Sequence, residues 1–369
     1  MPAAMTRTIL LNPGPVTLTA RVRAALGRGD WCHREPEFAA LVRSINARLA
    51  GVYAELAEDY DAVLLTGSGT AAVEGMLCGF APRDRSTLVL ANGVYGERMA
   101  RMLAAHGRPH RVLDHDWLAP VSIPRLEAAL AADPAISHVA VVHHETTTGR
   151  LNDLEAIGQA CRAWGVGLLL DGVSSFGAEH IAGRDWNLTA VAATANKCLH
   201  GAPGLSFVLA RRDLWLRPGP RPGSVYLDLR SHHAAQHADG FSPFTQAVQL
   251  AFALDAALDE HREEGGWQAR RATYCGRAAR VAATLQDLGV TTLLPPSESG
   301  SVLWSYRLPG RLGYAGLHDA LRRRGFVIYA GQGRLAPGIF RIAHMGDISA
   351  DDLDRLCAAL RTAIRGRRR

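Results

Sequence analysis

Short, wholly apolar runs alternate with amphipathic segments over residues 60–172, and this pattern restricts the fold more than any other feature of the chain. A strand that is apolar on both faces must be covered on both faces, which happens where helices cross over a parallel sheet. Each run is followed by a stretch of helical periodicity. We therefore expect an α/β fold with a mostly parallel sheet. The runs are AVLLTG (62–67), STLVLANG (86–93), HVAVVHHE (138–145) and VGLLLDG (166–172).

The C-terminal part of the chain has a different pattern, which predicts a second, smaller α+β lobe. A long helical pattern over 245–264 leads into it, and from Trp267 onward helical segments alternate with strand-like ones. At 369 residues the chain is long enough for two lobes. The strand-like runs are SVLWSYRL (301–308), FVIYAG (326–331) and IFRIAHMG (339–346). We expect an N-terminal arm over 1–15, a large domain over 16–262 and a small domain over 263–369.

Composition and charge argue against several classes of protein. The net charge of +6 is scattered, and the one basic run, RGRRR at 365–369, is interpreted as a solvated end, so no nucleic-acid partner is expected. No stretch approaches the ~18 apolar residues of a membrane span. The six cysteines are far apart and form no CxxC pair, which predicts neither a zinc ribbon nor a disulfide framework. We expect a cytoplasmic protein with no metal site.

Lysine occurs only once in the sequence. The chain has 41 Lys and Arg residues, and Lys197, in ANKCLHG, is the sole lysine among them. Arginine performs most surface roles of a cation but keeps its proton at working pH, so it cannot act as a nucleophilic amine. Either a bias in composition left one lysine by chance, or the chain keeps that amine for chemistry.

Polar residues follow the apolar runs, where ligands bind in sheets of this kind. Gly67 to Thr70 separate a strand from a helix start, which suits a phosphate cup, a weak dinucleotide turn or simply a tight loop. Asp171 directly follows an apolar strand, where an acid is costly unless it is paired or functional; magnesium binding and a structural cap are the alternatives. A nicotinamide dinucleotide would want an acid at a strand end ~20 residues past the glycines, and Asp84 lies in a loop.

Two groups of histidines are candidate metal sites. His143, His144 and Glu145 are adjacent on one strand end, so their side chains point to opposite faces. His233 and His237 have helical i,i+4 spacing, but without a nearby acid they make a poor site. We interpret the SHHAAQH stretch as a polar loop before the long helix.

Pyridoxal phosphate is the cofactor that uses these features together. It needs a lysine amine for a Schiff base, a carboxylate beside its pyridine nitrogen and an anion cup for its phosphate. Lys197, Asp171 and the turn at Ser68 to Thr70 would supply them. The protonated ring withdraws electrons from the substrate, and the lysine amine can shuttle a proton.

The order of motifs resembles the class V aminotransferases of fold-type I, over about residues 11 to 364. The motifs are NPGP, GSGTAAVE, NGVYGER, HHETTTG, DGVSSFG, ANKCLHGAPG and FRIAHMG. Within the class, ISHVAVVHHETTTGRLN, ANKCLHGAPGLSFVLAR and GFVIYAG are most similar to the 2-aminoethylphosphonate:pyruvate transaminases. The resemblance implies a pyridoxal phosphate-dependent transferase with a large, mostly parallel seven-stranded sheet domain, a small C-terminal domain, and a homodimer with active sites at the subunit interface.

The resemblance also implies roles for individual residues. Lys197 would carry the Schiff base and Asp171 would pair the pyridinium. The cofactor's other contacts would come from Ser68, Gly69, Thr70, Tyr95, Thr146, Val173 and Asn196, and from Thr245 or Ser242 of the partner subunit. Arg341 in FRIAHMG would bind the substrate carboxylate or phosphonate, and Arg34 is a further candidate.

The implied reaction is ping-pong amino transfer between 2-aminoethylphosphonate and pyruvate, in either net direction, with a biosynthetic direction as one option. HREPEF (33–38) resembles the corresponding segment of alanine–glyoxylate and serine–pyruvate enzymes, which form the alternative. A lyase or desulfurase on the same fold would need a mobile reactive cysteine, whereas Cys198 lies in a segment expected to pack against the cofactor.

Overall fold

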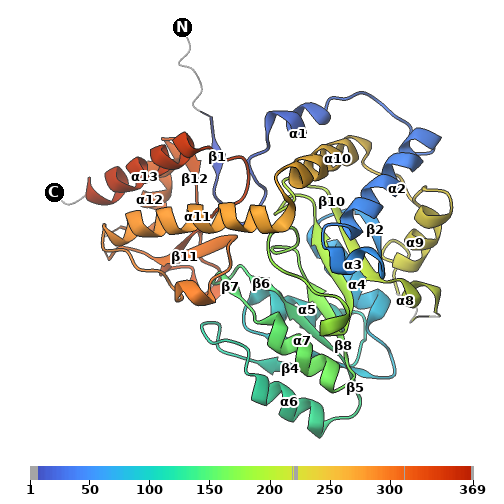
Figure 1. Cartoon of the computed structure of the whole chain (residues 1–369). Coiled ribbons are helices and arrows are strands. Elements are labelled where there is room, and N and C mark those ends of the chain that lie inside the picture. The colour runs from blue at the N-terminus through green and yellow to red at the C-terminus, as the bar shows by residue number, and fades with distance from the viewer. Residues whose placement is uncertain (1–6, 218, 220–222, 311, 367–369) are drawn as a thin grey trace.

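A seven-stranded sheet forms the centre of the computed structural model, which describes residues 7–217, 219, 223–310 and 312–366 (Figure 1). β10 runs antiparallel to both of its neighbours, and the other adjacent strands run parallel. The expectation of a large, mostly parallel seven-stranded sheet is confirmed. In spatial order the strands are β2 (Tyr60–Thr66), β10 (Leu205–Arg211), β9 (Leu188–Thr194), β8 (Gly167–Asp171), β5 (Ile136–Val142), β3 (Ser86–Ala91) and β4 (His110–Asp114).

Helices cover both faces of this sheet, as its continuous apolar strands require. Alternate residues of β2 serve the two faces: Leu64 belongs to one apolar cluster, and Val63 and Leu65 belong to the other. The first face is covered by α2 (Pro36–Ala50), α6 (Ile123–Ala132), α7 (Leu154–Ala163) and α10 (Val248–Glu263). The second face is covered by α4 (Gly69–Phe80) and α5 (Val94–Ala105).

The C-terminal lobe has its own core around a three-stranded antiparallel sheet. Its elements are α11 (Gly266–Gln286), β11 (Leu303–Arg307), α12 (Tyr314–Arg322), β12 (Phe326–Val327), β13 (Tyr329–Ala330), β14 (Ile339–Ala343) and α13 (Ala350–Arg365). The N-terminal strand β1 (Ile9–Leu10) pairs in parallel with β12, so Ile9 and Leu11 are buried in this core (Figure 1). The beginning and the end of the chain therefore share one hydrophobic core.

Several elements differ from the sequence pattern. FVIYAG divides into β12 and β13, because its first residues pair with β1 and its later ones with β14. The strands β4, β9 and β10 complete the sheet without having been singled out as apolar runs. The remaining short elements are α1 (Ala20–Ala25), α3 (Ala54–Ala57), β6 (His144–Glu145), β7 (Arg150–Leu151) and α8 (Arg212–Leu216). Among the described residues no helix has the length and apolarity needed to cross a bilayer.

The SHHAAQH stretch is a helix, and the prediction of a polar loop without a nearby acid is wrong on both counts. α9 (Leu229–Ala238) contains both histidines, and its first turn is capped by Asp228. An acid from a distant strand lies beside them: Asp61 Oδ2 is 3.1 Å from His233 Nε2. That contact joins residues far apart in the sequence, so local spacing could not reveal it.

Candidate active site

Lys197 lies in the loop between β9 and β10, just beyond the carboxyl end of a buried strand. Its Nζ donates a hydrogen bond to the carbonyl oxygen of Pro13. The next residue, Gly14, has a φ of +114°, and a Cβ there would lie 2.6–2.8 Å from Lys197 Cδ, Cε and Nζ. Glycine satisfies both demands. Burial lowers the pKa of the Lys197 amine to about 8, so more of it is neutral near pH 7 than in an exposed lysine.

Asp171 ends β8, the strand next to β9 in the sheet. Its Oδ1 accepts a hydrogen bond from the backbone N–H of Val173 at 2.9 Å. No other described residue hydrogen-bonds its carboxylate. Burial raises the pKa of the Asp171 carboxyl to about 6, although the nearby Lys197 acts in the opposite direction. The carboxylate therefore accepts a single hydrogen bond from the described part of the chain, at the carboxyl end of a central strand. A cationic ring nitrogen bound beside it would stabilise its charged form.

The glycine-rich turn after β2 leads directly into α4. Ser68 is the N-cap residue, but its hydroxyl makes no capping hydrogen bond, and both Ser68 and Thr70 are exposed. Gly69 is buried, and a Cβ there would lie 2.9 Å from Val173 Cγ2. Two hydroxyls and the first N–H groups of a helix therefore remain available to an anion.

A small cavity joins the turn to Asp171. Its lining is Gly69, Thr70, Val73, Tyr95, Arg98, Met99, Met102, Asp171 and Val173. Tyr95 and Val173, which the resemblance implies as cofactor contacts, both line it. Arg98 was not predicted. Its guanidinium carbon lies 4.7 Å from the Tyr95 ring centroid, and its Nη1 is 3.4 Å from Thr70 Oγ1. The i,i+3 spacing of Tyr95 and Arg98 on α5 is the sequence signal for this pair.

Glu145 has a structural role that the sequence analysis missed. Its carboxylate accepts hydrogen bonds from the backbone N–H groups of Tyr95 (3.3 Å) and Gly96 (3.4 Å), so it caps α5 from another strand. It also accepts from the backbone N–H and the hydroxyl of Thr147. A Cβ at Gly93 would lie 2.4 Å from Glu145 Cδ. Burial raises the pKa of Glu145 to about 7. These contacts fix Tyr95 rather than hold a metal between His143, His144 and Glu145.

Arg341 is fully buried on β14 and contacts Thr146, which directly follows the short strand β6. Its Nη1 donates to the Thr146 carbonyl at 2.7 Å and to Gln332 Oε1 at 3.0 Å, and its Nε donates to the Ala330 carbonyl at 2.8 Å. Its Nη2 is buried without an acceptor among the described residues. An unpaired guanidinium N–H in a buried position is costly, and a bound anion would satisfy it.

Thr146 and Asn196 are the two remaining predicted cofactor contacts within the same subunit. Thr146 is buried, and its backbone carbonyl is the acceptor for Arg341. Asn196 precedes Lys197, and its Oδ1 accepts a hydrogen bond from the Thr194 hydroxyl at 2.8 Å. Thr194 in turn lies against Gly69, where an added Cβ would be 3.3 Å from Thr194 Cβ. The chain thus brings Asn196 close to the glycine-rich turn.

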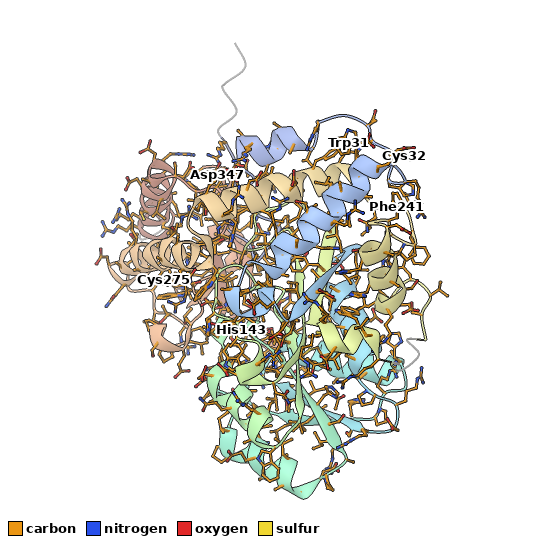
Figure 2. The ribbon with its side chains drawn as sticks, turned by 45° about the vertical axis from the view of Figure 1, so that its right-hand side comes forward. Trp31, Cys32, His143, Phe241, Cys275 and Asp347 are labelled. Carbon is orange, nitrogen blue, oxygen red and sulfur yellow. The ribbon has the colours of Figure 1, made fainter. Side chains whose placement is uncertain are left out.

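Arg34 and Thr245 lie outside the cavity lining, and both are exposed. Arg34 donates hydrogen bonds to the backbone carbonyls of Ser242 (2.7 Å) and Pro243 (3.2 Å). These bonds join the segment that contains Arg34 to the segment that contains Ser242 and Thr245. The labelled residues beside these segments, Trp31, Cys32 and Phe241, lie well away from His143 in Figure 2. The substrate-binding role of Arg34 and the role of Thr245 in the partner subunit's phosphate cup stay predictions.

The residues that line this site fit pyridoxal phosphate. The cavity lining includes the aromatic ring of Tyr95, the branched aliphatic side chain of Val173 and the Asp171 carboxylate, which accepts one hydrogen bond among the described residues. At the adjoining helix start the Ser68 hydroxyl makes no capping hydrogen bond, the Thr70 hydroxyl accepts one from Arg98, and a Cβ at Gly69 would press against Val173. A planar cationic heterocycle that carries a phosphate has the complementary chemistry.

Comparisons with known proteins agree with this geometry. The family model described as aminotransferase class-V matches residues 30–332. The 2-aminoethylphosphonate–pyruvate transaminase of Pseudomonas aeruginosa is 35% identical over 99% of this chain and 98% of its own. A crystal structure of an alanine–glyoxylate aminotransferase from Nostoc sp. superimposes with a TM-score of 0.90 at 25% identity, covering 98% of this chain and 97% of its own. A subgroup IV aspartate aminotransferase from Thermus thermophilus gives 0.88 at 27% identity, with coverage of 97% and 99%.

Proposed function

The chain belongs to the class V aminotransferases, and from this premise we propose that it uses pyridoxal phosphate to transfer an amino group between 2-aminoethylphosphonate and pyruvate. Near-full-length similarity to a transaminase of that name supports the substrate pair. The products of this transfer would be phosphonoacetaldehyde and L-alanine. The chemistry runs in two half-reactions, so one site must accept a phosphonate amine and an oxo acid in turn.

The buried, partly unpaired Arg341 carries the proposal. Its position is fixed by the Thr146 carbonyl, Gln332 and the Ala330 carbonyl, which leaves Nη2 free for a ligand. A planar guanidinium binds either a carboxylate or a phosphonate oxygen pair. The two substrates share an anionic end and a reacting carbon bonded to nitrogen or oxygen, so one arginine can orient both.

We propose that Lys197 moves the proton of the amine-bearing carbon of the substrate. When bound, pyridoxal phosphate supplies a protonated ring that accepts the electron pair left as a proton leaves the amine-bearing carbon. The Lys197 Nζ would take that proton from the amine-bearing carbon of the substrate and would later return it. Its pKa of about 8 gives an amine that both accepts and donates a proton near neutral pH.

Asp171 and the glycine-rich turn would hold the two ends of the cofactor. The Asp171 carboxylate, anchored by the Val173 N–H, keeps a negative charge where the pyridine nitrogen would lie. Ser68 and Thr70 would bind the phosphate at the start of α4, with Gly69 leaving room for it. Tyr95 and Val173 would confine the ring between them.

The subunit arrangement and domain division are part of the same proposal. We propose a homodimer in which the exposed Thr245 or the neighbouring Ser242 completes the partner's phosphate cup, with Arg34 fixing that segment through its carbonyl contacts. The proposed arm (1–15), large domain (16–262) and small domain (263–369) place Lys197 and Arg341 in different domains. Both lobes therefore contribute to one site.

The test is a spectral titration of the cofactor-loaded protein. 2-Aminoethylphosphonate should bleach the visible band of the bound cofactor, and pyruvate should restore it, with phosphonoacetaldehyde and L-alanine as products. Lys197→Arg should abolish both changes, because an arginine cannot act as the amine.

Parallel titrations with L-alanine plus glyoxylate and with L-serine plus pyruvate address the alternative activity. The similarity to the Nostoc enzyme makes that comparison worthwhile. Bleaching by alanine or serine, without restoration of the band by phosphonoacetaldehyde, would refute the phosphonate assignment and leave the transaminase assignment intact.

A further inference from the structure

α9 lies along β2, the outermost strand of the seven-stranded sheet, and three of its side chains reach that open edge. Gln236 pairs with the backbone of Leu64, accepting from its N–H at 2.9 Å and donating to its carbonyl at 2.7 Å. His237 Nε2 is 3.3 Å from the Ala62 carbonyl oxygen. His233 Nε2 is 3.1 Å from Asp61 Oδ2. The helix thus covers an edge that would otherwise be unpaired.

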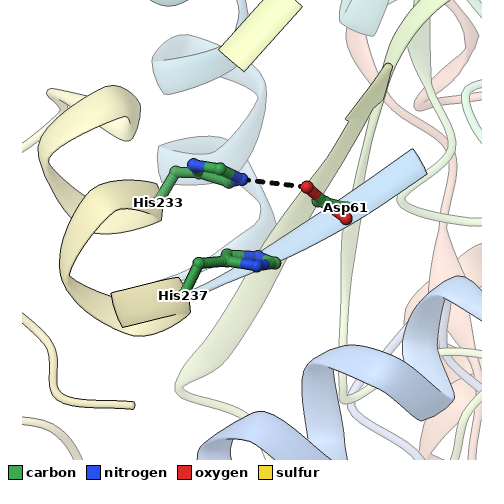
Figure 3. Close-up of side chains that lie close together, drawn as sticks. All are labelled: Asp61, His233 and His237. Atoms are coloured by element: carbon green, nitrogen blue, oxygen red, sulfur yellow. Dashed lines mark hydrogen bonds and ion pairs between the residues drawn. The ribbon is translucent and has the colours of Figure 1, made fainter. Parts of the chain in front are cut away.

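Two of these side chains and one on the strand converge on a single point. One ligand atom from each of Asp61, His233 and His237 lies within 4.8 Å of the other two, and this is the one such group among the described residues. Figure 3 shows both imidazoles reaching from successive turns of one helix toward Asp61. We propose that Asp61, His233 and His237 form a binding site for one transition-metal dication of the zinc class.

The spacing suits such an ion. Zinc–nitrogen and zinc–oxygen bonds of about 2.0–2.1 Å put the ligands of a tetrahedral ion about 3.4 Å apart. The separation of His233 Nε2 and Asp61 Oδ2, at 3.1 Å, is already close to this value. His237 is exposed, so its ring can close the remaining gap by a change of side-chain torsion. His233 binds through its Nε2 lone pair, which places the proton of the neutral ring on Nδ1.

The surroundings hold the ligands in place. The His233 ring is stacked between Trp215, with centroids 4.6 Å apart, and His237, at 4.1 Å. Arg212 Nε donates to Asp61 Oδ1 at 3.1 Å, which leaves Oδ2 facing the histidines. Hydrogen bonds of this outer kind orient metal-binding carboxylates. The positive charge of Arg212 also opposes a dication, so we expect micromolar rather than nanomolar affinity.

The donor set selects the class of ion. Two imidazoles and one carboxylate suit zinc, nickel, cobalt or copper, whereas magnesium and calcium prefer oxygen ligands alone. Three protein ligands leave at least one position for water. Asp61 lies near the start of β2 and the glycine-rich turn follows its end, about 20 Å along the strand. The ion would therefore bind apart from the cofactor site and clamp α9 onto the sheet edge.

The experiment uses untagged, cofactor-loaded protein that has been freed of metal by a chelator. Titration with zinc chloride in a calorimeter should give one zinc ion per chain and raise the thermal unfolding midpoint. Asp61→Asn and His237→Ala should each weaken zinc binding by at least about tenfold, since loss of even an outer contact costs that much. Transamination without zinc should be unchanged in both variants.

His106→Ala is the matched control. His106 Nε2 lies 2.7 Å from Glu74 Oε1, so it is also a histidine–carboxylate pair, but it belongs to no group of three ligands among the described residues. This variant should bind zinc as the parent does. The absence of stoichiometric zinc binding, or binding that His237→Ala leaves unchanged, would overturn the proposal. If Asp61→Asn fails to fold, the exposed His237 decides the matter alone.

Discussion

Gly14 lies directly against Lys197, the proposed catalytic lysine, and we expect it to set the position of that side chain, which replacement of Gly14 with alanine tests directly. A Cβ at Gly14 would lie 2.6 Å from Lys197 Cδ and 2.8 Å from Nζ, whereas ordinary contacts between carbons are about 3.5–4.0 Å. The obstructed atoms are at the end of a flexible side chain. The lysine will therefore move by about 1 Å rather than the backbone, and a displacement of that size can lower a rate about 100-fold.

Gly29→Ala separates the two effects of the substitution. Gly29 has a φ of +126°, close to the +114° of Gly14, but a Cβ there would meet nothing within 4 Å. Both variants should lose about 1–3 kcal/mol of unfolding free energy from backbone strain. Only Gly14→Ala should lose activity.

The assay pairs urea unfolding with kcat/KM for 2-aminoethylphosphonate and pyruvate. We expect similar losses of stability in the two variants and a fall of about 100-fold in kcat/KM for Gly14→Ala alone. Equal activity in the two variants would refute the argument that Gly14 positions Lys197. Cofactor content, measured by absorbance, must be matched before the rates are compared.

Three further predictions follow from the charges and contacts of the site. Once a substrate amine has displaced Lys197 from the cofactor, the neutral form of the Lys197 amine would accept the proton, and its pKa is about 8. In a pH–rate profile kcat should therefore rise with pH through about 8; a flat kcat profile from pH 6 to 9 would contradict this. Asp171→Asn should lower kcat/KM by at least about 100-fold. The same substitution should stabilise the cofactor-free protein by up to about 3 kcal/mol at pH 8, because folding raises the pKa of Asp171 from its usual 3.8 to about 6 and its ionisation therefore costs stability as the pH increases through that range. Urea unfolding at pH 4 and pH 8 would measure this difference. Arg341→Lys should reduce kcat/KM for both 2-aminoethylphosphonate and pyruvate by about 10- to 100-fold, since a charge-assisted hydrogen bond contributes about 1.5–3 kcal/mol. Gln332→Ala, which removes one contact that holds Arg341 Nη1, should reduce both values by less. A loss of kcat/KM for one substrate alone would show that the two anions bind at different groups.

The fold could be predicted where strands are continuous apolar runs buried on both faces. β4 was missed because it is an edge strand with exposed residues, among them Val112 with 46% of its surface accessible. β9 is fully buried, but its sequence LTAVAAT contains three alanines, which give a weaker apolar signal than the leucine-rich β8. In both cases position in the sheet, which the local sequence does not specify, decided the outcome.

The features of the site also fall into those that the local sequence predicts and those that it does not. Asp171, Lys197 and the glycine-rich turn could be proposed because each follows a strand, and parallel strands end at one edge of a sheet. The contact of Lys197 with Pro13 and that of Asp61 with His233 span 184 and 172 residues. Nothing in the local pattern encodes either one. Glu145 shows a third case, since its residue type drew attention but its capping of α5 required the structure.

The pairing of β1 with β12 also determines when this protein can finish folding. During synthesis Ile9 and Leu11 leave the ribosome long before Phe326, which pairs with Ile9, and Leu360, which belongs to the same apolar cluster. β1 therefore has no partner strand until β12 has been synthesised. Contacts of such high sequence separation slow folding and leave apolar surface exposed in the nascent chain. Because Pro13 follows this strand, the acceptor for Lys197 is among the last parts of the site to be placed.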